Sequence, residues 1–454
     1  MGIPKTPQVP SSPKKKKSTT LDYLFKLEAS QESPTDDLLS LISNCNTLFT
    51  FRNPSESPSL QDLKRHSLLH ILSILRTSKS RINPLILSPL FSMISTNLFR
   101  SLPATGFPFL SSEYSFDDDA PPMVLSPLWP HLHIIYDILS VLIANIDPIS
   151  LQSHIDNPFL LNLLTLFQSE DPRERDRLKN IYHQLYSKMT NKRLFMRRSM
   201  SNTFLHFVFE ADRHCGIGEL LEICGSIING FTTPLKEEHK VFLMRVLIPL
   251  HKQKGMCMYY RELSYCVTEF VQKEPDLSTG VVKGILRCWP MTNCTKEILL
   301  IGELEDLVEV MEAEEFEKVA GVLCSQIARC LNSCNSQVAE RALYIWNNEH
   351  FVRMAWRCIE VILPSLVQAI EKNINWHWNK SVQNLTASVK KMLEEMEPGL
   401  YSKCLEDLNI QETMAGEEKK RRKEMWKRLE CAASDENLFQ ATNSSCSTLR
   451  FECF

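Results

Sequence analysis

The chain has 454 residues, and Lys and Arg nearly balance Asp and Glu, leaving a formal net charge of -3. This balance argues against a general nucleic-acid-binding protein, because such domains are strongly basic. No apolar run reaches the roughly 18 residues that a membrane-spanning helix needs. The 15 cysteines are dispersed without a Cys-x-x-Cys pair, and no apolar signal segment opens the chain. We therefore expect free thiols and no zinc site.

Residues 1–35 are rich in Pro, Ser, Thr and Lys and are expected to form a disordered tail. Gly2 fits the minimal myristoylation pattern, and the four lysines at 14–17 would supply the polybasic second membrane signal. The same lysines fit a nuclear import signal, and the plainest interpretation is a solvating basic tail. We expect a protein of the cytoplasm and the nucleus.

From Leu38 onward the pattern is helical, and the chain is predicted to be all-α. Glycine is scarce, at 13 residues, and alternating strand patterns are nearly absent. Helix pairs recur about every 35 to 45 residues, which is typical of a HEAT-type solenoid whose repeats bury one another's apolar faces. The later predicted helices span residues 261–272, 296–311, 316–331 and 338–347.

In chain order, residues 68–75 carry an apolar stripe, and a polar, proline-dotted interruption follows at 103–127. This interruption contains Asp117, Asp118 and Asp119. Consecutive acids on a loop rarely converge on one metal ion, so a solvated or partner-facing charge run is favoured over a metal site. A further helix is predicted to open at Trp129.

The next clear helix start is at Asp171. Its carboxylate can cap free amides, Pro172 suits the first turn, and Glu174 completes a capping-box spacing. The helix carries core-spaced apolar residues, which are Leu178, Ile181, Tyr182 and Leu185.

The most informative stretch is residues 218–240. Ile223 and Ile227 stand at i, i+4, and Lys236 and His239 stand at i, i+3 on a second helix, so each pair shares a helix face. An apolar shelf beside a cationic corner suits an extended peptide that carries an aliphatic side chain and a carboxylate.

A neighbouring pair belongs with this stretch. His183 and Tyr186 stand at i, i+3 and project together, and Arg193 lies just beyond their helix. Successive repeats of a solenoid line a continuous surface, so all these residues could form one groove. The residues alone favour the plainer alternative, in which the isoleucines are core and the His and Lys are ordinary surface.

No catalytic motif occurs, and the sequence predicts no enzyme, no cofactor and no bound metal. Residues 413–433, with the basic run at 419–423, are predicted to be a charged, solvated helix end, with a basic interaction tail as the alternative. Residues 434–454 are expected to be disordered. The helical-repeat domain is placed at 36–412.

From about residue 30 to 408 the chain resembles the B-prime (B56-type) regulatory subunits of protein phosphatase type 2A. The matching segments are specific and lie in the family's order. They span residues 171–176, 222–231, 234–240, 249–252, 338–343, 346–349 and 377–380.

The resemblance implies a curved HEAT-like α-solenoid of stacked antiparallel helix pairs without activity of its own. It implies binding to the phosphatase scaffold subunit and catalytic subunit, and recruitment of substrates by Leu-x-x-Ile-x-Glu segments. The aliphatic part of the segment is assigned to His183, Tyr186, Ile223 and Ile227. Its glutamate is assigned to Lys236 and His239, with Arg193 supporting nearby acids.

Two features depart from the family pattern. Gln184 stands where family members usually have arginine, and a neutral amide lacks the bidentate charged grip of a guanidinium. Residues 116–119 look like the family's acidic loop facing the catalytic subunit, without its longer glutamate-rich run. The alternative hypothesis from another class is a helical-repeat adaptor or transport scaffold unconnected to phosphatase.

Overall fold

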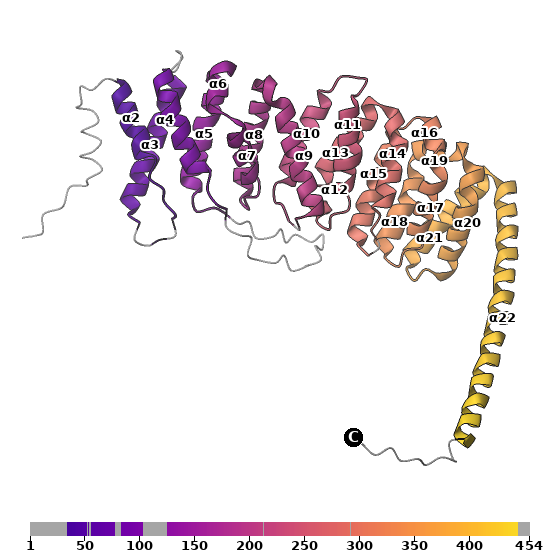
Figure 1. Ribbon diagram of the computed structural model, residues 1–454. Helices are drawn as coiled ribbons and strands as arrows, with labels where there is room; N and C mark the ends of the chain where they lie inside the picture. Colours follow the sequence, from indigo (N-terminus) through magenta and orange to yellow (C-terminus); the bar gives the residue numbers. More distant parts are fainter. Residues whose placement is uncertain are drawn as a thin grey trace, which may run out of the picture. The chain divides into compact units, whose positions relative to one another are not determined.

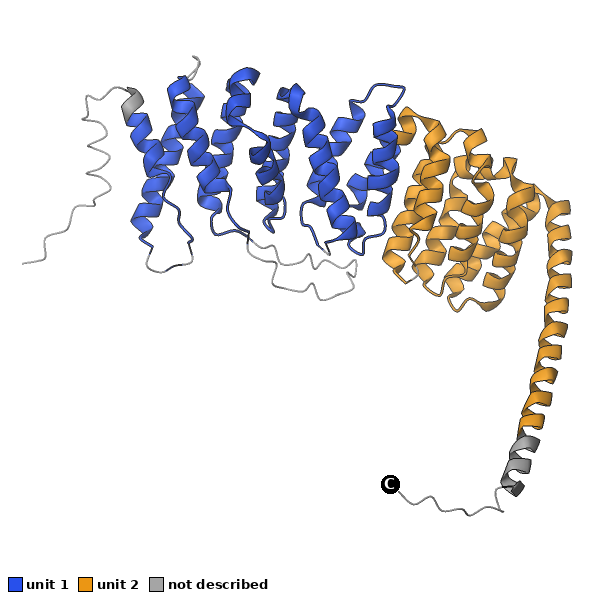
Figure 2. Cartoon of the chain, viewed as in Figure 1, with its two compact units in different colours: residues 1–269 blue, residues 270–454 orange. Residues whose placement is uncertain are grey.

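The computed structural model describes residues 34–51, 53, 56–77, 83–102, 125–211, 213–290 and 292–443. All regular structure in these ranges is helical (Figure 1), so the prediction of an all-α protein is confirmed. The chain divides into two compact units, residues 1–269 and 270–454 (Figure 2). The sequence alone indicated one repeat domain.

Unit 1 is a succession of helices in which α3 packs against α5, α5 against α8 and α8 against α10. Each of these helices therefore covers the apolar face of the next, as in a solenoid. The helices are α2 (Pro34–Asn44), α3 (Pro58–Thr77), α4 (Pro84–Leu98), α5 (Trp129–Asn145), α6 (Pro148–His154), α7 (Asn157–Leu166), α8 (Pro172–Lys188), η1 (Thr190–Lys192), α9 (Arg193–Phe209), α10 (Ile217–Asn229), α11 (Glu237–Phe242), η2 (Leu243–Leu247), α12 (Ile248–Leu250), η3 (Met256–Met258) and the start of α13 (Tyr260–Lys273).

Unit 2 contains two rows of helices. One row runs from α15 through α18 to α21, and the other runs from α17 through α20 to α22. That the pairs are HEAT repeats stays a prediction. The elements are η4 (Pro275–Leu277), α14 (Ser278–Arg287), α15 (Cys294–Val310), α16 (Ala313–Glu317), α17 (Ala320–Leu331), α18 (Ser336–Tyr344), η5 (Ile345–Asn347), α19 (Glu349–Arg357), α20 (Ile359–Trp376), α21 (Lys380–Met396) and α22 (Pro398–Asn443).

Most predicted helices are present, with differences at their ends. A helix opens at Trp129 as expected, whereas the predicted helix 316–331 is divided between α16 and α17. Not all of the apolar stripe at 68–75 is buried. Leu68, Ile71, Leu72 and Leu75 lie on the buried face of α3, whereas Leu69 is exposed. The helix α22 continues to Asn443, past residue 433, where the charged helix end was expected to stop.

The start of α8 follows the sequence closely, with one correction. The Asp171 carboxylate accepts a hydrogen bond from the Arg173 amide at 3.0 Å, and Pro172 occupies the first turn. Burial opposes ionisation of Asp171, but hydrogen bonds from Arg173 and Ser126 outweigh it and lower the pKa of the carboxyl. The Asp171 amide, by contrast, donates to the Ser169 hydroxyl rather than to Glu174 as a capping box would have it. The Glu174 carboxylate is buried, and Arg100, Tyr136 and Ser169 bind it.

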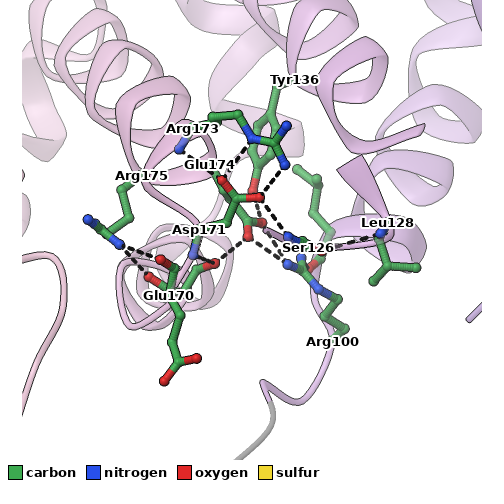
Figure 3. A network of polar contacts seen from close by, with 11 residues as sticks. Arg100, Ser126, Leu128, Tyr136, Glu170, Asp171, Arg173, Glu174 and Arg175 are labelled. Carbon is green, nitrogen blue, oxygen red and sulfur yellow. Dashed lines mark hydrogen bonds and ion pairs between the residues drawn. The ribbon is translucent and has the colours of Figure 1, made fainter. Parts of the chain in front are cut away.

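Figure 3 shows this buried carboxylate at the centre of a polar cluster. Both Glu174 oxygens accept from the Arg100 guanidinium, at 2.8 and 2.7 Å, and Tyr136 and Ser169 donate at 2.7 and 2.6 Å. Burial disfavours the charge of Arg100, but its hydrogen bonds and attraction to Glu174 raise its pKa. The cluster joins α4, α5 and α8, and α8 carries part of the predicted groove.

We expect Arg100→Leu to destabilise the chain by about 3 kcal/mol, because it leaves a buried carboxylate without its counter-charge. The midpoint of urea unfolding, followed by circular dichroism, measures the loss. The control is Arg76→Leu, which removes an exposed pair to Asp137 at 3.4 Å and should cost under about 1 kcal/mol. Equal costs for the two variants would contradict this account of the Glu174 cluster.

Candidate groove on unit 1

The predicted groove residues lie on four neighbouring helices of unit 1, namely α8, α9, α10 and α11. Two ion pairs join α8 to α10, from Arg175 to Glu219 and from Lys179 to Glu222, each at 2.7 Å. Because residue numbers rise in the same direction along both helices at these pairs, α8 and α10 run parallel. The predicted pairs follow these ion pairs along the two helices. His183 with Tyr186 and Ile223 with Ile227 therefore lie toward the same, C-terminal end of α8 and α10.

Tyr186 is held in place by two arginines of α9. The Arg193 guanidinium donates to the Tyr186 carbonyl at 3.0 Å and to the Ser187 carbonyl at 2.9 Å, and it lies 5.4 Å from the Tyr186 ring centroid. Arg193 thus satisfies carbonyls at the end of α8, where a helix has unpaired acceptors and a partial negative charge. Arg197 donates to the Tyr186 hydroxyl at 3.1 Å. The ring is therefore fixed from both of its ends.

Arg197 also links this cluster to α11. Its guanidinium lies 3.4 Å from the Glu238 carboxylate, and Glu238 lies 3.6 Å from Nε2 of His239. Arg197 and Glu238 were not predicted from the sequence. The only available signal was that Arg197 follows Arg193 by four residues, which places both on one face of a helix.

His239 is nearly buried and stacks on Phe231, with ring centroids 3.8 Å apart and planes 1° apart. Its Nδ1 is buried without a hydrogen-bond partner in the part of the chain that the structure describes. Burial lowers the pKa of His239 most, nearby Arg197 and Lys236 lower it further, and Glu238 opposes them. The imidazole is therefore held neutral at pH 7.

The two isoleucines lie mostly inside the helix packing. Ile223 is 1% exposed and Ile227 is 8% exposed, so Ile227 is the one closer to the surface. Between them, Gly225 faces Tyr265 of α13, and a Cβ atom at this glycine would lie 2.9 Å from two ring carbons of Tyr265. The glycine therefore lets α13 approach α10 closely on the side of the helix away from the two isoleucines.

The remaining predicted residues are exposed. Lys236 lies at the N-cap of α11, one turn before His239, and the two interact electrostatically. His183 and Gln184 are exposed on α8, and the Gln184 amide oxygen accepts from the Ser140 hydroxyl of α5 at 3.2 Å. Gln184 is thus directed toward α5, on the other side of α8 from the arginine cluster.

The remaining predicted features are the acidic loop, the absence of a bound metal and the absence of a membrane-spanning helix. Asp117, Asp118 and Asp119 lie outside the described residues. Within the described ranges, no cluster of His, Cys, Asp or Glu is arranged to hold a metal ion. None of the described helices is long and apolar enough to cross a membrane.

Comparison with known proteins identifies the chain's relatives. The family model of the protein phosphatase 2A regulatory B subunit (B56 family) matches residues 23–433. The chain belongs to this family. It is 43% identical over 399 residues to the B' beta isoform of the serine/threonine protein phosphatase 2A 57 kDa regulatory subunit of Arabidopsis thaliana, covering 87% of this chain and 80% of that protein. It is 42% identical over 398 residues to the B' kappa isoform of the 57 kDa regulatory subunit of Oryza sativa subsp. japonica, covering 87% of this chain and 78% of that protein.

The predicted family is therefore confirmed, and with it a regulatory, non-catalytic role, because these B56 relatives are named regulatory subunits. The names of the family and of these relatives connect them to protein phosphatase 2A. The alternative of an adaptor unconnected to phosphatase is not supported by this membership. The comparisons do not test the roles of individual groove residues, which stay predictions.

We expect an NMR titration to give His239 a pKa below the usual 6.5. In the unfolded chain this imidazole takes up a proton at higher pH than in the folded chain, so its burial stabilises the fold above pH 6.5 and less as the pH falls below that value. Arg197→Gln should raise this pKa by removing a nearby positive charge, and Glu238→Gln should lower it. An unchanged pKa in both variants would mean that the three side chains do not share one electrostatic cluster.

Proposed function

We propose that the chain assembles with the scaffold and catalytic subunits of protein phosphatase 2A and recruits substrates through Leu-x-x-Ile-x-Glu segments held on unit 1. The observation that carries the proposal is the cluster of Arg197, Lys236 and His239 at the end of the α10 isoleucine face. It supplies cationic and hydrogen-bonding groups beside an apolar surface, as a segment with aliphatic residues and a glutamate requires.

The chemistry of the cluster supports glutamate as the anchoring residue. Nε2 of His239 lies 3.6 Å from Glu238, beyond hydrogen-bonding distance, so this ring nitrogen can donate to a bound carboxylate instead. Lys236 is exposed and can donate to a carboxylate in a charge-assisted hydrogen bond. Arg197 is already placed by Tyr186 and Glu238, so a bound carboxylate would meet an ordered cation.

The aliphatic residues of the segment would lie along α8 and α10. Ile227 and Tyr186, each 8% exposed, present the edge of an otherwise buried apolar surface. A preformed surface of this kind binds with little loss of side-chain freedom on the protein side. Arg193 is engaged by the end of α8, and we assign it the role of holding Tyr186 and adding positive charge for acids near the segment.

Recruitment would act by tethering. A substrate held on unit 1 presents its phosphorylated residue to the catalytic subunit at a high effective concentration, without new contacts at the catalytic centre. We assign Asp117, Asp118 and Asp119 to the surface that faces the catalytic subunit.

We also propose residence in both cytoplasm and nucleus, because the lysines at 14–17 fit an import signal. Imaging a tagged chain with these lysines changed to alanine tests that assignment.

The glutamate of the docking segment should contribute strongly to its affinity. The purified chain should bind a Leu-x-x-Ile-x-Glu peptide with a Kd of about 1 μM to 100 μM, and glutamate-to-alanine substitution in the peptide should weaken binding at least about tenfold. Lys236→Glu should have a comparable effect, because it replaces an exposed donor by a repelling charge. Isothermal titration calorimetry gives both values.

Assembly separates a groove defect from a folding defect. Lys236→Glu should still capture the scaffold and catalytic subunits in a pull-down, since Lys236 is exposed. If Lys236→Glu loses both assembly and peptide binding, Lys236 contributes to folding or to the holoenzyme interface instead of the groove. Capture of both subunits without any peptide binding by the unmodified chain would retain the regulatory role and refute the groove.

Gln184 should limit the response of the chain to acidic docking segments. A phosphoserine or an acid that the docking segment places over the α5-facing side of α8, where Gln184 lies, should increase affinity less than about threefold, because Gln184 lacks a positive charge. Gln184→Arg should enlarge that increase and make it weaken with added salt. The comparison needs four titrations, with plain and phosphorylated peptide against each form of the chain. A large, salt-dependent increase in the unmodified chain would contradict the prediction.

A further inference from the structure

The second half of α22 has no packing partner within the described part of the chain. The first turns are seated in unit 2, where Tyr401 and Cys404 are buried and the Tyr401 hydroxyl donates to Glu371 at 3.0 Å. From residue 409 to 433 every residue is exposed. Figure 1 shows this later part of α22 standing clear of α20 and α21. A solvent-exposed helix of this length gains little stability by itself.

The exposed part of α22 carries large apolar side chains on one side. Met414, Met425 and Leu429 are 66%, 55% and 61% exposed. A spacing of 11 residues is close to three helical turns and a spacing of 4 is close to one, so these three side chains share one face. Trp426, at 65% exposure, borders it. Single exposed apolar residues are ordinary, whereas an aligned group of this kind marks an interaction surface.

The same segment is basic. Residues 417–430 contain seven Lys or Arg and four Glu. Lys419 and Lys423 precede Trp426 by seven and three residues and lie beside it, and Lys427 lies opposite the apolar face. Arg428 borders the face on the other side from Trp426, and Arg421 lies on the face itself, between Met414 and Met425. Positive charge therefore lies on both sides of Met425, Trp426 and Leu429, and an acidic partner would complement it.

Local contacts hold the segment as a helix. The Trp426 indole N–H donates to Glu430 at 2.9 Å, and Arg422 pairs with Glu418 at 3.2 Å, each across one turn. Such pairs add a few tenths of a kcal/mol each to a helix. They present the tryptophan and its neighbours in a helical arrangement before a partner arrives.

We propose that residues 410–430 of α22 are a docking helix for an acidic protein with a methionine-lined apolar groove, the kind of groove that an EF-hand calcium sensor opens when it binds Ca²⁺. The inference is independent of the groove on unit 1. An acidic, enveloping groove takes up Met425, Trp426 and Leu429 and pairs with the cations around them.

The distribution of charge favours such a groove over a membrane surface. Glu418 and Arg421 both lie on the apolar face, between Met414 and Met425. A helix in a bilayer interface requires an unbroken apolar face, because charges on that face would be buried among acyl chains. A protein groove with acidic rims accommodates cations on both sides of a short apolar segment.

The test uses the full-length chain and calmodulin as the probe, titrated in a calorimeter with calcium and again with excess chelator. Binding should be about micromolar or tighter in calcium and absent in chelator. The double variant Met425→Ala, Trp426→Ala should weaken binding at least about tenfold, since central aromatic anchors carry much of the energy at such interfaces. Lys419→Gln with Lys423→Gln should weaken binding less and reduce its salt dependence.

The matched control is Trp376→Ala, which removes a tryptophan that is 83% exposed at the end of α20 and should leave the affinity unchanged. Circular dichroism checks that each variant keeps its helix content. No binding in calcium, or binding that the double variant does not weaken, overturns the proposal. Two other results would assign the face to a different partner and overturn the proposal, if calmodulin does not bind. One is binding to phosphatidylserine vesicles that the double variant abolishes. The other is a dimer of the free chain, seen in light scattering, that the double variant abolishes.

Discussion

The carboxylate of Glu174 imposes the constraint on which the arrangement of unit 1 depends. It is fully buried, and a buried carboxylate is tolerated only when its oxygens are occupied by donors and a counter-charge. Arg100, Tyr136 and Ser169 meet that requirement from three separate places in the sequence. They can do so only if the end of α4, the middle of α5 and the start of α8 come together. The buried charge in the first turn of α8 is thus compatible only with a packing that brings these three helices together.

The positions of the groove residues depend on that arrangement. With its start fixed by the cluster, α8 is aligned with α10 by the pairs from Arg175 and Lys179. Its other end is fixed by Arg193, which binds the last carbonyls of α8. Tyr186 therefore lies on a helix secured at both ends. A rigid support of this kind suits recognition of a short segment, because the protein loses little freedom on binding.

Local patterns in the sequence predicted local structure well. The helix start at Asp171 and the buried face of α8 followed from residues within a few positions of one another. The partners of Glu174 did not, since Arg100 lies 74 residues away and nothing in the spacing distinguishes a capping glutamate from a buried one. Arg197 was missed for the same reason, because Glu238, its acidic partner, lies 41 residues further on. Periodicity in the sequence shows which face of a helix is apolar. It does not show which distant residue pairs with a charged side chain on that helix.

The two candidate docking surfaces differ in how they are prepared for a ligand. On unit 1 the cation of Arg197 is already paired with Glu238, and the imidazole of His239 is stacked and neutral. An incoming carboxylate must compete with Glu238 for Arg197. Only a carboxylate with good geometry toward Arg197 therefore gains much binding free energy from it. On α22 the apolar side chains and the lysines are exposed, with no competing partner for Lys419 or Lys423 among the described residues. The first arrangement favours geometric selection of one carboxylate, and the second favours capture of an extended acidic surface.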